Sequence, residues 1–184
     1  NTTASNNTAV GYQAGLSNTV GTANTFLGKE AGKAIVGGQQ NTMLGMQAGN
    51  VGGTGVSYST YVGEGTGYSS TGDYNTYIGH RAGVSMTSGA KNTILGRYNG
   101  NEGGLDIRTS SNNIVLSDGA GNATYVVKGG EGAGLLLRGA DPDNFGKFYK
   151  KIVKSNANQA ATLLTVSSYG GNDRVYVRVR VMAV

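Results

Sequence analysis

A short phrase of polar, apolar and glycine positions recurs along the first hundred residues. It consists of Asn-Thr, two apolar residues, Gly, two variable residues, a small residue and Gly, and its first full copy is Asn7–Gly15. The copies begin at residues 7, 24, 41, 59, 75 and 92, which are 17, 17, 18, 16 and 17 residues apart; the fourth copy is degraded. Such a regular period indicates a solenoid, in which each unit buries its apolar side chains against its neighbours.

Each unit predicts one short strand with apolar residues on both faces. Adjacent strand residues point to opposite faces, so two apolar neighbours need cover on both sides, as in a buried parallel sheet. Counting from the Asn, position 4 is always aliphatic, and we expect it to form the interior core of the repeat: Val10, Leu27, Leu44, Val62, Ile78 and Leu95. Position 3 varies in size, and we expect it to face neighbouring chains around a three-fold axis, with the candidates Phe26, Met43, Tyr61, Tyr77 and Ile94.

The other positions predict corners and turns. Thr at position 2 shares a face with position 4, which predicts an internal or half-buried ladder. Asn at position 1 suits a corner where its amide bonds its own backbone or the next Asn. Gly at positions 5 and 9 indicates positive φ or close backbone approach, and positions 6 and 7 are expected in an exposed turn. The predicted fold is therefore all-β: a parallel β-helix or β-roll of 17-residue coils, trimeric, about 29 Å long at about 4.8 Å per coil.

The period fails after residue 100, and the chain divides into three expected parts. Residues 1–121 form the repeat shaft, with residues 112–121 as a closing coil, and residues 122–144 form a connecting segment with short strands at 125–128 and 135–138. Residues 145–184 read as an incomplete antiparallel β module with strands at 145–154, 161–168 and 175–184. The first residues are polar and begin mid-repeat, which favours a segment of a longer polypeptide.

Composition removes several classes of protein. The chain has 184 residues, 33 Gly and no Cys, and 14% of its residues are charged. Glycine without a three-residue period excludes collagen, and the lack of Cys excludes disulfides and thiolate metal sites. No apolar run is long enough for a transmembrane helix, so we expect no membrane insertion. The net charge is +5, and residues 145–184 carry seven basic groups and one acidic group. A solvated face is the simplest interpretation, with acidic glycans or lipopolysaccharide phosphates as alternatives; nucleic acid is the least favoured partner.

Catalytic chemistry has little support. His80 is the one histidine and has no second His or Cys with which to bind a metal. The carboxylates that glycoside hydrolysis would need are Glu102, Asp106, Asp118, Asp141 and Asp143, and all are better explained as turn residues. We therefore expect no enzyme, no catalytic residue, no cofactor and no metal.

Two surface hypotheses remain. Tentative contacts with surface glycans are Tyr98, Lys150, Lys151, Arg178 and Arg180. The Thr ladder raises an ice-binding β-helix as a rival. Such a face needs outward-facing Thr ranks, and it is disfavoured here because the Thr residues share a face with the expected interior position.

The phrases Asn7–Gly15 and Asn24–Gly32 resemble the repeats of bacteriophage tail-fibre proteins. They are also similar to the head repeats of YadA-type trimeric autotransporter adhesins, which form a left-handed parallel β-roll trimer. The resemblance covers residues 1 to about 121, and the 17-residue period, longer than the adhesin coil, favours the phage relatives.

The resemblance implies a structural segment of a viral tail fibre, located in the virion, that forms a trimeric shaft and supports host-surface attachment. Its implied partners are further copies of itself, other virion tail proteins, and a host cell-surface glycan or protein. The alternative is a trimeric adhesin on a bacterial cell surface. A third interpretation is part of a polysaccharide-degrading tailspike whose active segment lies elsewhere.

Overall fold

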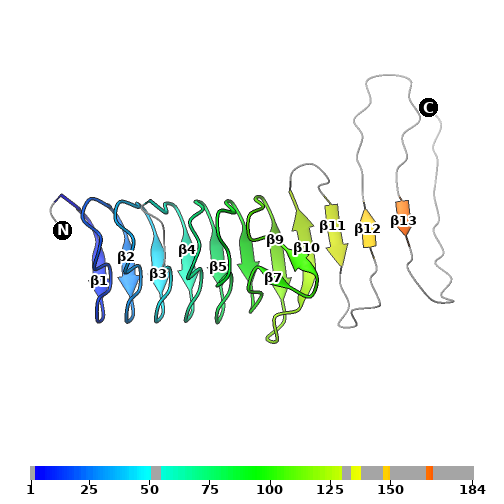
Figure 1. Ribbon diagram of the computed structural model, residues 1–184, viewed down its shortest axis with the longest axis horizontal. Coiled ribbons are helices and arrows are strands. Elements are labelled where there is room, and N and C mark those ends of the chain that lie inside the picture. Colours follow the sequence, from blue (N-terminus) through cyan, green and yellow to red (C-terminus); the bar gives the residue numbers. More distant parts are fainter. Residues whose placement is uncertain (1–2, 51–54, 130–133, 138–146, 150–164, 168–184) are drawn as a thin grey trace, which may run out of the picture.

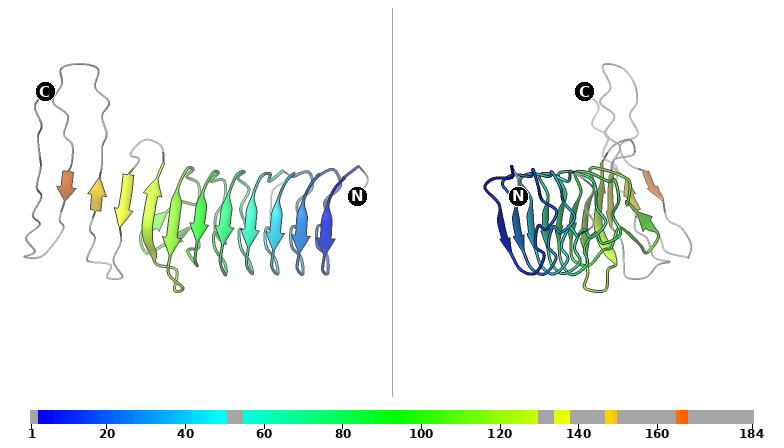
Figure 2. Two further views of the ribbon diagram at one scale, coloured as in Figure 1. Left: turned by 180° about the vertical axis from the view of Figure 1, so that it is seen from behind. Right: turned by 60° about the vertical axis from the view of Figure 1, so that its left-hand side comes forward.

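The protein is an all-β parallel solenoid of about six turns of about 17 residues (Figure 1). The computed structural model describes residues 3–50, 55–129, 134–137, 147–149 and 165–167, and these contain no helix. Each turn contributes one three-residue strand, and the strands stack along the solenoid axis (Figure 2). They are β1 (Thr8–Val10), β2 (Thr25–Leu27), β3 (Thr42–Leu44), β4 (Thr60–Val62), β5 (Thr76–Ile78) and β6 (Thr93–Leu95).

The parallel register joins equivalent repeat positions. Thr8 pairs with Thr25, Thr25 with Thr42, and the series continues through β6. Strand β9 (Ile114–Ser117) then pairs parallel with β6, which confirms the expected closing coil. Strands β10 (Ala123–Lys128) and β11 (Gly134–Leu137) continue the sheet in antiparallel order, so the sheet extends into the segment 122–144 that we expected to be a connection.

A small hairpin covers the interior beside the last coil. It consists of β7 (Asn101–Glu102) and β8 (Leu105–Asp106), and Leu105 and Ile107 are buried in the core. Further along, β12 (Lys147–Tyr149) and β13 (Thr165–Ser167) pair antiparallel inside two of the spans expected to be strands. The expected strand at 175–184 lies outside the described residues.

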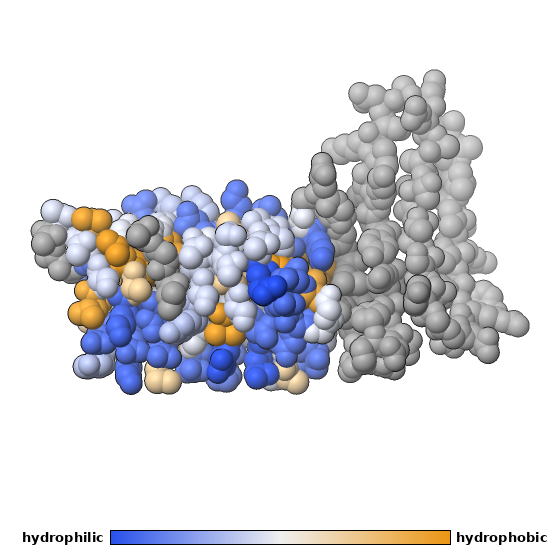
Figure 3. Space-filling view, in the orientation of Figure 1, coloured by the Kyte–Doolittle hydropathy of each residue, from blue (hydrophilic) through white to orange (hydrophobic). Residues whose placement is uncertain are grey.

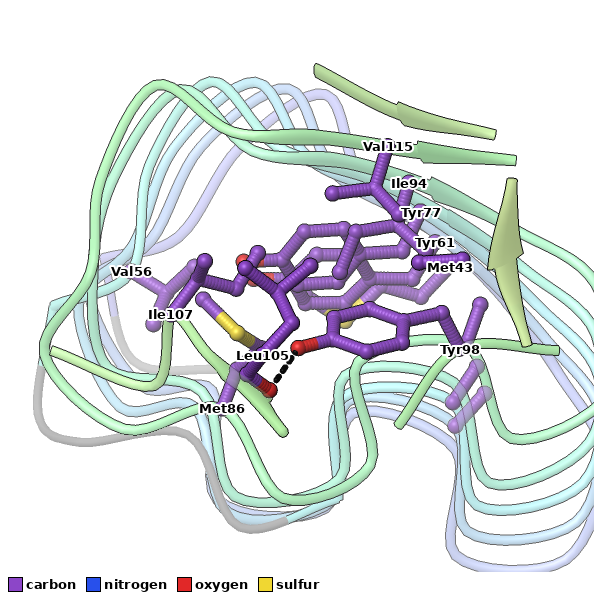
Figure 4. Close-up of a cluster of buried hydrophobic side chains, with 14 of the residues drawn as sticks. Met43, Val56, Tyr61, Tyr77, Met86, Ile94, Tyr98, Leu105, Ile107 and Val115 are labelled. Carbon is purple, nitrogen blue, oxygen red and sulfur yellow. Dashed lines mark hydrogen bonds between the residues drawn. The ribbon is translucent and has the colours of Figure 1, made fainter. Parts of the chain in front are cut away.

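Position 3 of the repeat lines the interior. Phe26, Met43, Tyr61, Tyr77 and Ile94 are each at most 1% exposed, and the rings of Tyr61 and Tyr77 stack with centroids 5.0 Å apart (Figure 4). The Gly at position 9 makes room for these side chains. A Cβ on Gly67 would lie 2.8 Å from the Tyr61 ring, and one on Gly83 would lie 2.7 Å from the Tyr77 ring. The small residues at position 8 complete the interior, and Ala31, Ala48, Thr66 and Ala82 are buried, as expected.

The expected roles of positions 3 and 4 were therefore wrong and are exchanged. The expected core residues Val10, Leu27, Ile78 and Leu95 are 38–55% exposed, while Leu44 and Val62 are half-buried. The expected trimer-facing residues fill the interior instead (Phe26, Met43, Tyr61, Tyr77 and Ile94). The physical reason is space: position 9 has no side chain, and the large position 3 side chains occupy the volume that this glycine leaves.

The Asn residues form a buried ladder from coil to coil, as the sequence predicted. Asn75 Oδ1 accepts a hydrogen bond from the backbone N–H of Asn92 at 2.9 Å, and Asn92 Oδ1 accepts one from Asn113 at 2.9 Å. Ser59 takes the place of Asn in the fourth coil, and its Oγ accepts the Asn75 N–H at 3.1 Å. Because buried backbone groups need partners, this ladder fixes the corner of every coil.

Backbone conformation at the turns agrees with the glycine pattern, with one feature that the sequence did not reveal. The Gly residues at position 5 have φ between 108° and 135°. Residues at position 7 and directly before the Asn also have positive φ although most are not Gly, as in Glu30, Gln47, Tyr58 and Tyr74. These side chains carry no shared signal, so sequence reasoning could not place them in the left-handed region.

Candidate interaction face

One side of the solenoid carries a continuous row of aliphatic side chains, five of them exposed and two half-buried. We name this side the outer strand face; it is the side of β1–β6 and β9 directed away from the interior. Its aliphatic row consists of Val10, Leu27, Leu44, Val62, Ile78, Leu95 and Leu116, and strand register pairs each member with the next. Val10 is 55% exposed and Leu27 45% exposed, so a large apolar area remains uncovered on a single chain.

A second row runs beside the first on the same face. It consists of Thr8, Thr25, Thr42, Thr60, Thr76 and Thr93, followed by the exposed Ile114. Five of these Thr residues are half-buried, as expected, but they lie on the outer side instead of the interior side. Neither row contains a charged residue, and successive members are about 4.8 Å apart in a parallel sheet. The outer strand face is therefore regular and neutral.

The outward Thr row removes an argument made from the sequence. An ice-binding face was disfavoured because the Thr residues were expected to share a side with the core. That premise was wrong, since position 4 and Thr both face outward. The outer strand face still differs from a regular ice-binding Thr array, because the row beside the Thr residues is a mixture of Val, Leu and Ile side chains.

The margins of the outer strand face are mixed in character. Before the strands, Tyr58 and Tyr74 stack with ring centroids 4.7 Å apart, and Gln39 Nε2 donates to the Tyr58 hydroxyl oxygen at 2.7 Å. After the strands, His80 Nε2 lies 2.9 Å from Glu64 Oε2. In the view of Figure 3, hydrophilic residues dominate the described coils and hydrophobic residues form separate patches.

The predicted glycan contacts are not brought together. Tyr98 is completely buried, so its assignment as a surface contact was wrong; its hydroxyl donates to the Leu105 carbonyl oxygen at 2.5 Å (Figure 4). The reason is the β7–β8 hairpin, which interrupts the repeat after this residue and contacts its side chain. The other four candidates, Lys150, Lys151, Arg178 and Arg180, lie outside the described residues.

Two of the candidate carboxylates, Asp106 and Asp118, hold loops together. Two hydrogen bonds from the Arg108 guanidinium and one from its backbone N–H lower the pKa of Asp106 to about 2. Hydrogen bonds from the Asn122 side chain and from backbone N–H groups, including those of Ala120 and Gly121, lower the pKa of Asp118. A carboxyl whose pKa is lowered is a poor proton donor near neutral pH. Asp141 and Asp143 lie outside the described residues.

Within the described part of the chain, no three His, Cys, Asp or Glu side chains are grouped as a metal site would require. The same residues contain no helix of the length and apolarity needed to cross a membrane. In comparisons with known proteins, no family model, no curated protein and no solved structure matches this chain.

Proposed function

We propose that this chain is a structural segment of a homotrimeric viral tail fibre, in which the solenoid forms a shaft that supports attachment to a host surface. The observation that carries the proposal is the aliphatic row, which runs in register along seven strands of a stacked solenoid and is exposed on five of them. Contiguous exposed apolar surface of this kind marks an interaction site in a water-soluble domain. Burying a Val, Leu or Ile side chain fully is worth about 1.5–3 kcal/mol, so covering even part of each member is favourable along the row.

A second copy of the chain is the partner that fits this row best. The row repeats once per coil, and another copy supplies the same spacing over the whole length. Because both rows are neutral, like surfaces meet without charge repulsion. Copies arranged around an axis along the shaft form a closed cyclic oligomer, and all chains then run in the same direction. Three is the number that the resemblance of the repeats implies.

The oligomeric proposal is tested by measuring the molar mass of the purified protein by light scattering. We expect about three times the chain mass of 18.8 kDa. A monomer would contradict the proposal. A monomer that also inhibits ice growth would instead make the outer strand face an ice-binding surface.

Location separates the viral proposal from the adhesin alternative. Antibodies against the chain should label the tails of purified virus particles in electron micrographs. Labelling of the bacterial cell surface in cultures free of virus would support the adhesin instead.

For the tailspike interpretation, the measurement is release of reducing sugar from host polysaccharide. Activity lost on changing a carboxylate between residues 101 and 143 would make the chain an enzyme.

A further inference from the structure

Three buried hydroxyl groups lie near one another inside the solenoid, close to the side chains of Ser59, Asn75 and Asn92 of the Asn ladder. They belong to Tyr61 and Tyr77 at position 3 of adjacent coils and to Ser70 between them in the sequence, and we name them the hydroxyl cluster. Tyr61, Ser70 and Tyr77 are each 0% exposed. None of their hydroxyl oxygens makes a hydrogen bond of normal geometry with another described residue. The stacked rings direct their hydroxyl ends across the interior, towards the side of Val56 and Ile107 (Figure 4).

The three groups are close enough to influence one another. Burial raises the pKa of both phenols, and the nearby Ser70 hydroxyl opposes that shift in each of them. Both phenols are therefore neutral at any ordinary pH. A neutral phenol or serine hydroxyl has one donor and free acceptor positions, so the cluster offers both kinds of group at one place.

The cluster replaces apolar residues found in other coils. Position 3 is Phe26, Met43 and Ile94 elsewhere. The position of Ser70 is occupied by the buried Ile35 and Met86 in two other coils and by the buried Asn18 in the first. Ser is much smaller than Ile or Met, so the side chain that introduces the third hydroxyl also takes less volume beside the two rings. Buried polar groups without partners are rare in native proteins, and a space with several such groups is where ordered water is found.

We propose that the hydroxyls of Tyr61, Ser70 and Tyr77 bind an ordered water molecule inside the shaft. The water accepts and donates hydrogen bonds among the three oxygens and so satisfies groups that the protein leaves unpaired. The site lies where the repeat spacing changes from 18 to 16 residues, at the coil that begins with Ser59. Directional hydrogen bonds there fix the orientation of two stacked rings in the least regular part of the repeat. This inference does not depend on the number of chains in the shaft.

A high-resolution crystal structure of the protein tests the site directly. We expect one well-ordered water peak within hydrogen-bond distance of all three oxygens. The proposal is overturned if the three hydroxyls bond one another or the side chains of Ser59, Asn75 and Asn92 directly, and no water peak is present.

Thermal melting gives an independent test. The change in melting temperature on removing a hydroxyl has opposite signs when water is bound and when the hydroxyls are unpaired. If water is bound, Tyr61→Phe and Tyr77→Phe each remove a made hydrogen bond and lower the melting temperature. If the hydroxyls are unpaired, the same changes remove a buried unsatisfied group, and the melting temperature is unchanged or rises. Tyr98→Phe is the positive control, since it loses the direct bond to the Leu105 carbonyl oxygen. Tyr12→Phe is the neutral control, since Tyr12 is 66% exposed.

Discussion

The side-chain Oδ1 atom of Asn24 accepts a hydrogen bond from the backbone N–H of Asn41, one coil later, at 3.0 Å. Its Nδ2 atom donates to the Gly38 carbonyl oxygen at 2.8 Å, so one buried amide joins the beginning of the next coil to the end of its own. Repetition of this contact along the chain connects all the coils at one corner. The ladder is a polar support of the solenoid.

Removing one member of the ladder should therefore destabilise the whole fold. Asn41→Ala leaves the Ser59 N–H and the Val56 carbonyl oxygen without their side-chain partners. Each of the two buried unpaired groups costs about 1–3 kcal/mol, so we expect a loss of about 2–6 kcal/mol in the free energy of unfolding, measured by denaturant titration. Asn41→Ser is the matched control, because Ser59 shows that a serine oxygen can accept the next N–H. Equal losses in the two variants would contradict the role of the ladder.

The Gly at position 5 is required by backbone contact. Gly28 has a φ of +134°, and a Cβ there would lie 2.6 Å from the Gly45 carbonyl oxygen in the next coil. We expect Gly28→Ala to lower the free energy of unfolding by more than about 2 kcal/mol, because the backbone must shift in two coils. Gly119→Ala is the control, since nothing lies within 4 Å of its added Cβ. A Gly28→Ala variant as stable as the Gly119→Ala variant would show that the coils can separate without cost.

The Asp106–Arg108 pair predicts a pH effect of known sign. The pKa of Asp106 falls from 3.8 to about 2 on folding, so its contribution is present above pH 3.8 and is lost as the pH falls towards 2. The pair is exposed, and we expect a small effect. Melting temperatures measured across this range should fall less steeply for Asp106→Asn and Arg108→Gln than for the unchanged protein. If the melting temperatures of all three proteins fall equally with pH, the pair does not contribute to stability in acid.

The sequence predicted the period, the strand in each coil, the Asn ladder and the glycine turns, because each of these has a distinct residue type at a fixed spacing. It could not decide which of two adjacent apolar positions faces inward. Strand alternation separates polar from apolar faces, and here Phe26 and Leu27 are both apolar. The Gly at position 9 of every coil was a usable signal. A position without a side chain leaves space inside the coil, and this space indicates that the large position 3 side chain points inward.

The outer strand face could not be predicted from the sequence either, because its position depends on which of the two apolar residues faces outward. Tyr98 shows a second limit: it stands at a turn position of the repeat, yet the β7–β8 hairpin buries it. Every coil has at least one residue with positive φ that is not Gly, and Glu30 and Tyr58 share no feature that would identify this. Such conformations are imposed by the stacked backbone.

Association should depend on the aliphatic row and not on exposed apolar residues in general. Leu27 in the row and Met46 outside it are each 45% exposed. We expect Leu27→Asn to raise the dissociation constant of the oligomer at least about tenfold, because a polar amide replaces apolar surface in the contact. Met46→Asn should leave it within about twofold. Light scattering over a dilution series measures both, and equal effects would place the contact elsewhere.

The central claim is that copies of the chain cover the outer strand face. The chain has no Cys, so single cysteines can be introduced and their reaction rates with a thiol reagent compared. Val10 in the aliphatic row and Val20 outside it lie in the same coil and are 55% and 54% exposed on the single chain. We predict that Val10→Cys reacts at least about tenfold more slowly than Val20→Cys in the native protein, and that the two rates converge after unfolding. Equal rates in the native protein would contradict the claim, because they would show that the aliphatic row is open to solvent.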